Sequence, residues 1–429
     1  MNKYLFIFLL LVTALSGQTV TTTFKDSTAP GWVFGGTGYT PNLTSGISDP
    51  SGDGWLRMSD NGLNRATYAY YDTALTATNR TIFASVDFAS YNGTGADGVG
   101  FFLFDGSTTF SIGASGGSLG YAQKTGIDGM AGGYIGVGLD DFGNYSNPTE
   151  GRTGGTGFVP NSVAVRGPGS GQTGYNFLGG TGDLSANPYN LGQMDFPSST
   201  TRPDQTGTDF RHMELILTTN NQLSVYLQFG TGGSLTKVLD LDLSSYVRPG
   251  TLKFGFFSGT GASTDIHDIR SFTFSSIQAL KWDNGNGNSR WNNSTNWAPN
   301  TIPTTGTDVV LDNTYVGSNQ AIDLRATQTI RSLQIDAPFS YTLNNNTLAF
   351  NNNGIPGIGG IHVTDLNGTA NHTINSAITA VNPISINNDS AGGLTINGNI
   401  TTISNTVSVG GTGNTTINGN LILGASGLT

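Results

Sequence analysis

The sequence predicts an all-β protein in two parts, a two-sheet jelly-roll sandwich followed by a parallel β-solenoid. Up to about residue 276, short apolar stretches alternate with clusters of Gly, Asn, Asp and Ser, and beyond residue 370 a short motif repeats. Short strands with turn residues between them are typical of sandwiches and jelly rolls. A repeat of about twenty residues is typical of a solenoid. At 429 residues, the chain is long enough for two or more domains.

Composition narrows the classes of function. The chain has 63 Gly, no Cys and a net charge of -10. The absence of Cys excludes disulfides, thiolate metal sites and a Cys nucleophile. The negative charge disfavours nucleic acid as a partner.

Residues 1–17 have the pattern of a secretory signal peptide. Lys3 precedes an apolar run at residues 4–12, and Ala14-Leu15-Ser16 has the small-x-small form of a cleavage site. The run is too short to span a bilayer as a helix. No other long apolar run follows, so we expect an exported bacterial chain, secreted or at the cell surface, with no membrane span in its mature form.

Residues 18–277 are expected to form the sandwich. The predicted strands are apolar, β-branched or aromatic stretches, at residues 81–88, 99–104, 134–139, 163–165, 213–217, 223–229, 252–257 and 269–274. The Gly-rich stretch at 152–182 predicts a long surface loop.

One of these strands runs into a loop rich in oxygen donors. The sequence from 136 to 148 ends an apolar run in Asp140 and Asp141 and continues through Phe142, Asn144 and Asn147. Closely spaced carboxylate, amide and carbonyl oxygens are what Ca²⁺ requires. The same residues also suit a site for a polar ligand, or an ordinary polar turn.

This loop resembles the metal-binding loop of the L-type, legume-lectin-like family. Asp140 matches the family's bridging Asp, Phe142 its carbonyl-donating aromatic, and Asn144 the Asn shared by calcium and sugar. Two positions depart from the pattern: Gly138 replaces the transition-metal Glu, and Asn147 replaces the Asp before Pro. No His follows in 159–166 to complete a second metal site.

Further motifs repeat the resemblance in the same order over roughly residues 21–276. They are the Ala-Asp-Gly segment at 95–102, the glycine loop at 116–120, the paired strands at 211–228 and the last loop and strand at 254–274. Within the last segment, we interpret His267 and Asp268 as structural.

The resemblance implies a carbohydrate site and assigns roles to its residues. Asp97, after a cis Ala-Asp peptide, would accept hydrogen bonds from two sugar hydroxyls. Gly117 would let a backbone N–H approach the ligand, and Asn144 would donate its amide. The remaining candidates are an aromatic face from Phe142 or Tyr145 and a rim at 259–263 that includes Gly261 and Ala262.

For the metal, the resemblance implies one weakly held Ca²⁺. Its ligands would be Asp140, the Phe142 carbonyl, Asn144 and either Asn147 or Glu150. With few carboxylates, the expected dissociation constant is roughly 10⁻⁴ to 10⁻³ M.

Catalysis is not expected. Glycoside hydrolysis usually needs two facing carboxyl groups, and the only two Glu, Glu150 and Glu214, lie far apart in the sequence. The side chains of adjacent strand residues such as Asp140 and Asp141 point to opposite faces.

Residues 278–320 are expected to form a linker or a solenoid cap. Trp282, Trp291 and Trp297 occur in a stretch rich in Asn, followed by a strand at 308–312. The segment resembles the start of repeat stalks in autotransporter-like bacterial surface proteins. The Trp cluster would either cap the solenoid or form a second sugar-binding surface.

Residues 321–429 are expected to form the solenoid. An Ile-Asn motif recurs at Ile374, Ile396 and Ile417, at spacings of 22 and 21 residues. Asn side chains at equivalent positions can form ladders between coils. The chain stops without a polar cap, which predicts that the solenoid is incomplete.

Together these features predict a carbohydrate-binding module of a secreted or cell-surface adhesin, with glycans as partners. The alternative is a structural surface or stalk protein whose lectin-like domain binds nothing. A glycoside hydrolase is the third and weakest reading.

Overall fold

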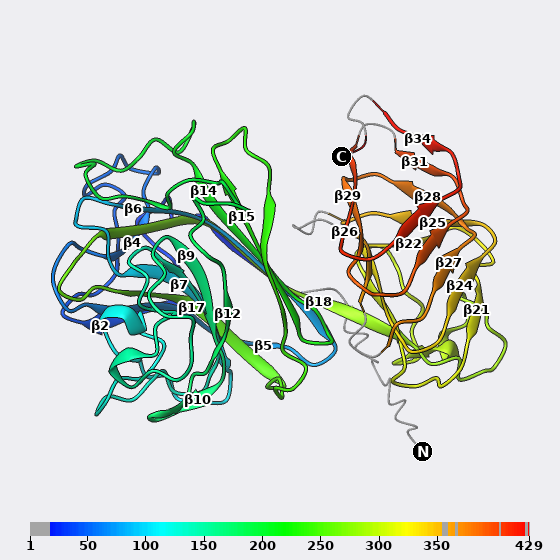
Figure 1. Ribbon diagram of the computed structural model, residues 1–429, viewed down its shortest axis with the longest axis horizontal. Coiled ribbons are helices and arrows are strands. Elements are labelled where there is room, and N and C mark those ends of the chain that lie inside the picture. Colours follow the sequence, from blue (N-terminus) through cyan, green and yellow to red (C-terminus); the bar gives the residue numbers. More distant parts are fainter. Residues whose placement is uncertain (1–17, 354–358, 365–367, 403–404, 425–427, 429) are drawn as a thin grey trace, which may run out of the picture.

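The computed structural model describes residues 18–353, 359–364, 368–402, 405–424 and 428. The expected signal peptide at 1–17 lies outside these residues. The described chain is almost entirely β-structure and forms two bodies side by side, joined by strand β18 (Figure 1). The predicted fold class, an all-β sandwich followed by a parallel β-solenoid, is confirmed. None of the described helices is long and apolar enough to cross a membrane.

The front sheet of the sandwich has seven antiparallel strands. In spatial order they are β12 (Phe177–Gly180), β9 (Ser162–Arg166), β8 (Gly133–Asp140), β7 (Gly98–Asp105), β17 (Thr251–Gly259), β5 (Ala66–Thr76) and β2 (Trp32–Thr37). The expectation that 152–182 is simply a loop is wrong, because this stretch contributes β9, β12 and the hairpin β10 (Gly169–Ser170) with β11 (Thr173–Gly174).

The back sheet packs behind it. Its main strands are β16 (Thr236–Asp242), β15 (Gln222–Phe229), β14 (Arg211–Leu217), β6 (Arg80–Tyr91) and β18 (Ile266–Trp282). Short strands complete its margins: β1 (Gln18–Thr22) and β4 (Leu56–Ser59) beside β18, β3 (Asn42–Leu43) beside β4, and β13 (Asp195–Phe196) beside β6. Along β14 the side chains alternate between buried and half-buried, so Met213, Leu215 and Leu217 face the core. This alternation is the period of a half-buried strand.

Two apolar cores hold the sandwich. Aromatic rings fill the space between the sheets, with Phe254 stacked on Phe274 at 3.9 Å between ring centroids. A second core lies on the other side of the front sheet, where loops cover it; it contains Phe102, Phe104, Tyr121, Tyr145, Tyr175 and Phe257. The loops that carry the candidate site are therefore anchored by buried aromatic side chains.

Strand β18 belongs to both bodies. Its residues up to Gln278 pair with β6 of the sandwich, and from Ala279 it pairs in parallel with β20 of the solenoid. The back sheet thus continues into the solenoid without a break (Figure 1).

The solenoid consists of three parallel sheets. The first continues from β18 through β20 (Asp308–Asp312), β23 (Ser332–Asp336), β26 (Gly359–Val363), β29 (Ile384–Asn388) and β32 (Val407–Gly410). The second holds β21 (Gln320–Asp323), β24 (Tyr341–Asn344), β27 (His372–Ile374), β30 (Leu394–Ile396) and β33 (Thr415–Ile417). The third holds β22 (Gln328–Ile330), β25 (Thr347–Phe350), β28 (Ala377–Ala380), β31 (Ile400–Thr402) and β34 (Leu421–Ile422). The repeated Ile374, Ile396 and Ile417 lie in register, one coil above the next.

An asparagine ladder runs along this stack. The side-chain amide of Asn375 donates to Asn344 at 2.8 Å, that of Asn397 to Asn375 at 2.7 Å, and that of Asn418 to Asn397 at 2.8 Å. The expected ladder between coils is therefore present.

The tryptophans of the connecting segment are buried. Trp282, Trp291 and Trp297 are all fully buried in the solenoid core, and their rings pack edge-on with centroids 5.0 and 4.7 Å apart. Trp297 lies in the short strand β19 (Trp297–Ala298), which follows the turn η3 (Ser294–Asn296) and pairs with the end of β18. Since no ring face is exposed, these residues pack within the solenoid core and are not a second sugar-binding surface.

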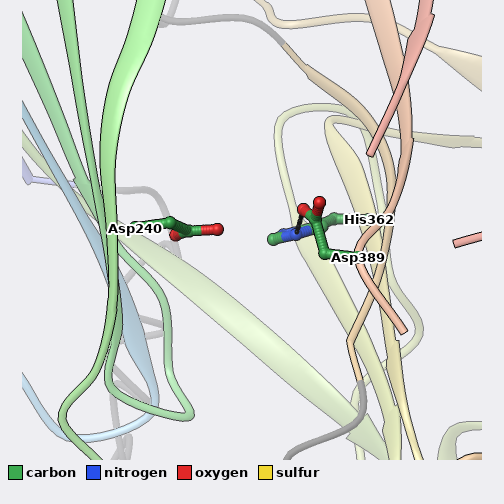
Figure 2. Close-up of side chains that lie close together, drawn as sticks. All are labelled: Asp240, His362 and Asp389. Carbon is green, nitrogen blue, oxygen red and sulfur yellow. Dashed lines mark hydrogen bonds and ion pairs between the residues drawn. The ribbon is translucent and has the colours of Figure 1, made fainter. Parts of the chain in front are cut away.

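A polar contact joins the two bodies. Figure 2 shows Asp240 of β16 pointing toward His362 and Asp389 of the solenoid. The ammonium of Lys237 lies 3.1 Å from a carboxylate oxygen of Asp240 and 3.1 Å from one of Asp389, and His362 Nε2 lies 3.0 Å from Asp389. Because a lysine cation already contacts both carboxylates, we interpret the group as an ion-pair contact between the bodies and assign it no metal.

Candidate functional site

The candidate site is formed where three neighbouring strands of the front sheet end. Gly98 at the start of β7 pairs with Asp140 at the end of β8 and with Gly259 at the end of β17. Backbone hydrogen bonds tie the adjoining loops together, from Asp97 N to Gly259 O and from Phe142 N to Asp97 O, both at 3.1 Å. Segments that are far apart in the sequence therefore meet at Asp97.

Asp97 lies at the centre of this meeting point. Its side chain follows a cis Ala96–Asp97 peptide and is 4% exposed. Its Oδ2 has no hydrogen-bond partner among the described residues. A Cβ added to Gly261 would lie 3.0 Å from this oxygen, and one added to Gly116 would lie 3.8 Å from it. The carboxyl group is thus flanked by two glycines and keeps a free acceptor.

Gly117 and Asn144 lie against each other beside it. Gly117 belongs to the short 3-10 turn η1 (Gly116–Ser118), and a Cβ at this position would come within 2.3 Å of Asn144 Cβ. Asn144 Oδ1 accepts a hydrogen bond from Asn147 Nδ2 at 3.2 Å. No described residue accepts from Asn144 Nδ2, which leaves this amide able to donate to a ligand. The structure therefore brings the predicted residues Asp97, Gly117 and Asn144 together around η1.

The two aromatic candidates have different surroundings. Phe142 is half-buried and packs edge-on against Phe158, with ring centroids 5.3 Å apart. Tyr145 is fully buried, and its hydroxyl donates to Gly136 O at 3.2 Å. The expectation that Tyr145 could stack on a sugar is therefore wrong, since its ring has no open face. Phe158, which is 54% exposed, was not predicted, because it lies in the Gly-rich stretch interpreted as loop.

The rim at 259–263 lies over the site. Gly261 N donates to Ser263 O at 3.1 Å, and Gly261 O accepts from Asn64 N at 3.0 Å. Gly261 is half-buried and Ala262 is exposed. Of the two predicted rim residues, Gly261 approaches the Asp97 carboxyl, whereas Ala262 lies at the outer tip.

Two cations that were not predicted, Lys124 and Arg152, lie beside Asp97. The Lys124 ammonium lies 3.4 Å from Glu150 Oε2, and a Cβ on Gly116 would come within 2.9 Å of it. Arg152 also pairs with Glu150, at 2.9 Å. Burial raises the pKa of Asp97 to about 6, and the attraction of Lys124 opposes this rise. No motif marked either cation, since both lie in irregular segments.

The side chains of Asp140, Asn144 and Glu150, which were predicted to bind calcium, already have protein partners. Asp140 is fully buried, and its two oxygens accept hydrogen bonds from Gly143 N at 2.8 Å and Tyr145 N at 2.7 Å. Burial raises its pKa to about 8. Asn144 Oδ1 is taken by Asn147, and Glu150 by Lys124 and Arg152. A donor set whose oxygens are already hydrogen-bonded or ion-paired in this way does not fit a Ca²⁺ site, which requires several free oxygens.

Behind the site lies a buried polar layer. His267 Nδ1 lies 2.7 Å from Ser59 Oγ, and its Nε2 lies 3.2 Å from Asp141 Oδ2. Asp268 is paired with Arg57 and Arg202 at 3.0 and 2.7 Å. These contacts support the structural roles predicted for His267 and Asp268.

The buried acids predict an unusual dependence of stability on pH. Burial raises the pKa of Asp97 to about 6, of Asp265 to about 7 and of Asp140 to about 8. Burial disfavours the charged form of His212, but the hydrogen bond to Asp87 and the nearby Glu214 carboxylate raise its pKa to about 9. At each of these four groups the folded-state pKa exceeds that of the unfolded chain, so these groups bind more protons in the folded protein. The free energy of unfolding should therefore fall as the pH rises from 6.5 to 9.

Thermal melting at pH 6.5 and 8.5, at equal ionic strength, measures this effect. The melting temperature should be higher at pH 6.5. Asp265→Asn should reduce the difference, and the exposed control Asp26→Asn should not. A melting temperature that is higher at pH 8.5 would contradict the prediction.

No protein-family model matches the chain, and no curated protein matches it. Among solved structures it is similar to peanut lectin bound to a nonapeptide, at 20% identity over 61% of this chain and 98% of that chain, with a TM-score of 0.41. It is also similar to the Lotus tetragonolobus seed lectin, at 16% identity, 61% and 98% coverage and a TM-score of 0.42. A third match is the exoplasmic/lumenal domain of VIP36 in its Ca²⁺- and Man3GlcNAc-bound form, at 15% identity, 58% and 87% coverage and a TM-score of 0.39. Each of these three chains is matched over most of its own length.

Proposed function

We propose that the sandwich is a carbohydrate-binding, lectin-like module and that the solenoid displays it as part of a secreted or cell-surface bacterial adhesin. One observation carries this proposal: Asp97 Oδ2 is buried, has no partner among the described residues, and lies between Gly116 and Gly261. A buried acceptor left without a partner costs free energy unless a ligand or water satisfies it.

The neighbouring groups suit a sugar. Hydroxyl groups both donate and accept, and the Asp97 carboxylate next to the free Asn144 amide offers both complements. Phe142 and the exposed Phe158 supply an aromatic surface for the apolar side of a sugar ring. A site this small binds one monosaccharide weakly, so display of several copies would give the useful avidity.

The proposal is binding without catalysis. Of the two Glu, Glu150 lies at the site but is paired with Lys124 and Arg152. Glu214 lies on β14 of the back sheet. They are therefore not the facing carboxyl pair that glycoside hydrolysis usually uses.

Export is a further part of the proposal, supported by the signal-like pattern of residues 1–17. Calcium assistance, which the resemblance implies, is not part of the proposal, because the oxygens of Asp140 and Asn144 already have protein donors.

A broad glycan array probed with the purified full chain tests the function. We expect binding to a defined set of glycans, read in parallel with Ca²⁺ and with EDTA. Binding to no glycan under either condition would favour the alternative, a structural stalk protein whose lectin-like domain binds nothing.

A further inference from the structure

We infer that the candidate site is built to work without a metal ion, because the loop at residues 140–157 is organised by buried guanidinium groups and a buried aromatic ring. The order of this loop does not depend on what the site binds, whereas metal-free glycan binding rests on the proposed function. The inference goes against the calcium site implied by the resemblance.

Arg166 is the main organising cation. It is fully buried on β9. Its Nε donates to Tyr145 O at 2.7 Å, and its Nη1 donates to Thr153 O and Tyr175 O, both at 2.9 Å. Nη2 donates to Gly154 O at 3.3 Å and Asn147 O at 3.5 Å. Inward-pointing carbonyl oxygens are ligands that Ca²⁺ would use, and here one guanidinium satisfies them.

Arg152 supplies the second cation. Its side chain has no exposed surface, and its Nε donates to Asn147 O at 3.0 Å. Its Nη1 contacts Glu150 at 2.9 Å and Ser118 Oγ at 3.0 Å, so it links the loop to the turn that carries Gly117. The Asn147 carbonyl therefore lies between two arginines. A divalent cation brought to the same place would be repelled by both, and strongly so in a buried setting.

Tyr145 fills the remaining space. A Cβ added to Gly136 or Gly138 would come within 2.6 or 2.5 Å of Tyr145 atoms. Gly138 is the position at which the family pattern has its transition-metal Glu, so the ring occupies the room that this carboxylate would need. The Arg166 guanidinium carbon lies 5.5 Å from the centroid of the Tyr145 ring, within range of a cation–π contact.

The local charge agrees with this arrangement. Asp140 is fully buried and hydrogen-bonded at both oxygens. Burial lowers the pKa of Arg166 to about 10, which still leaves the guanidinium charged. Two buried guanidinium groups, those of Arg152 and Arg166, thus lie against the loop.

The first test measures metal dependence without any glycan. The full chain is stripped with EDTA, dialysed, and melted with either EDTA or 10 mM CaCl₂, with metal content read by mass spectrometry. A site with a dissociation constant of roughly 10⁻⁴ to 10⁻³ M would be about nine-tenths filled or more at this concentration. It would raise the melting temperature by roughly 3 °C or more. We expect a shift below about 1 °C and no bound calcium; a clear rise, with calcium retained, would overturn the inference.

The second test probes the arginine. Arg166→Met removes the charge and keeps most of the length, Arg166→Lys keeps the charge, and the half-exposed Arg325→Met is the control. We expect faster hydrogen exchange across 140–157 in Arg166→Met, a smaller change in Arg166→Lys and none in the control. Added calcium should not restore protection. Unchanged exchange in Arg166→Met, or restoration by calcium, would contradict the inference.

The two proposals fail separately. If no glycan binds but the melting temperature is independent of calcium, the proposed function is wrong, and the inference that the loop is ordered without a metal ion is supported. If glycans bind and calcium raises both stability and affinity, the proposed function stands and this inference is wrong.

Discussion

Replacing Asp97 by Ala is expected to lower glycan affinity at least about tenfold. Hydrogen bonds to a charged acceptor contribute roughly 1.5 to 3 kcal/mol, and 1.4 kcal/mol corresponds to a factor of ten. The fold should remain intact, because the substitution removes a buried carboxyl whose Oδ2 has no partner among the described residues. The measurement is glycan binding by calorimetry or array, with circular dichroism to check folding.

Asp105→Ala is the matched control, since Asp105 lies at the opposite end of the same strand, β7. Its binding should match that of the unmodified protein. Asp97→Asn keeps the shape but adds a donor, so it should also bind weakly. If folded Asp97→Ala bound the same glycans with unchanged affinity, the assignment of the site would be wrong.

Trp297→Ala is expected to be the most destabilising single change in the solenoid. The ring is fully buried between Trp282 and Trp291, and its Nε1 donates to Trp291 O at 2.7 Å. Removing a buried Trp ring typically costs roughly 3 to 5 kcal/mol. Differential scanning calorimetry of the full chain should show the solenoid melting at a lower temperature.

Tyr315→Ala is the control in the same segment, because Tyr315 is 53% exposed. A surface change of this kind usually alters stability by about 0.5 kcal/mol or less. If Trp297→Ala melted like Tyr315→Ala, the packing of the Trp cluster would not stabilise the solenoid as expected.

Much of the fold was predictable because it follows from local patterns. The period of two in 213–217 and the recurrence of Ile374, Ile396 and Ile417 each reflect a side-chain direction that the backbone imposes. The meeting of Asp97, Gly117 and Asn144 was anticipated from the order of short motifs.

What escaped prediction depends on packing between distant segments. In the sequence, Tyr145 lies among polar residues, as an exposed loop residue would. Its ring is buried because the glycines at 136 and 138 on the preceding strand make room for it. Arg166 is the last residue of strand β9 and belongs to no motif. Its guanidinium nevertheless donates to carbonyl oxygens from three separate stretches of the chain. Such roles are set by three-dimensional contacts that no sequence period encodes.

The shared strand β18 has a mechanical consequence. Since Gln278 pairs with the sandwich and Ala279 with the solenoid, no flexible linker separates the two bodies. A force applied to the far end of the solenoid would act along β18. Many of the backbone hydrogen bonds of this strand would then resist the force together. The sandwich would also keep a fixed angle to the solenoid. Under the proposed function, copies held side by side on a surface would then meet a row of sugars with little orientational freedom left to lose, which favours simultaneous attachment.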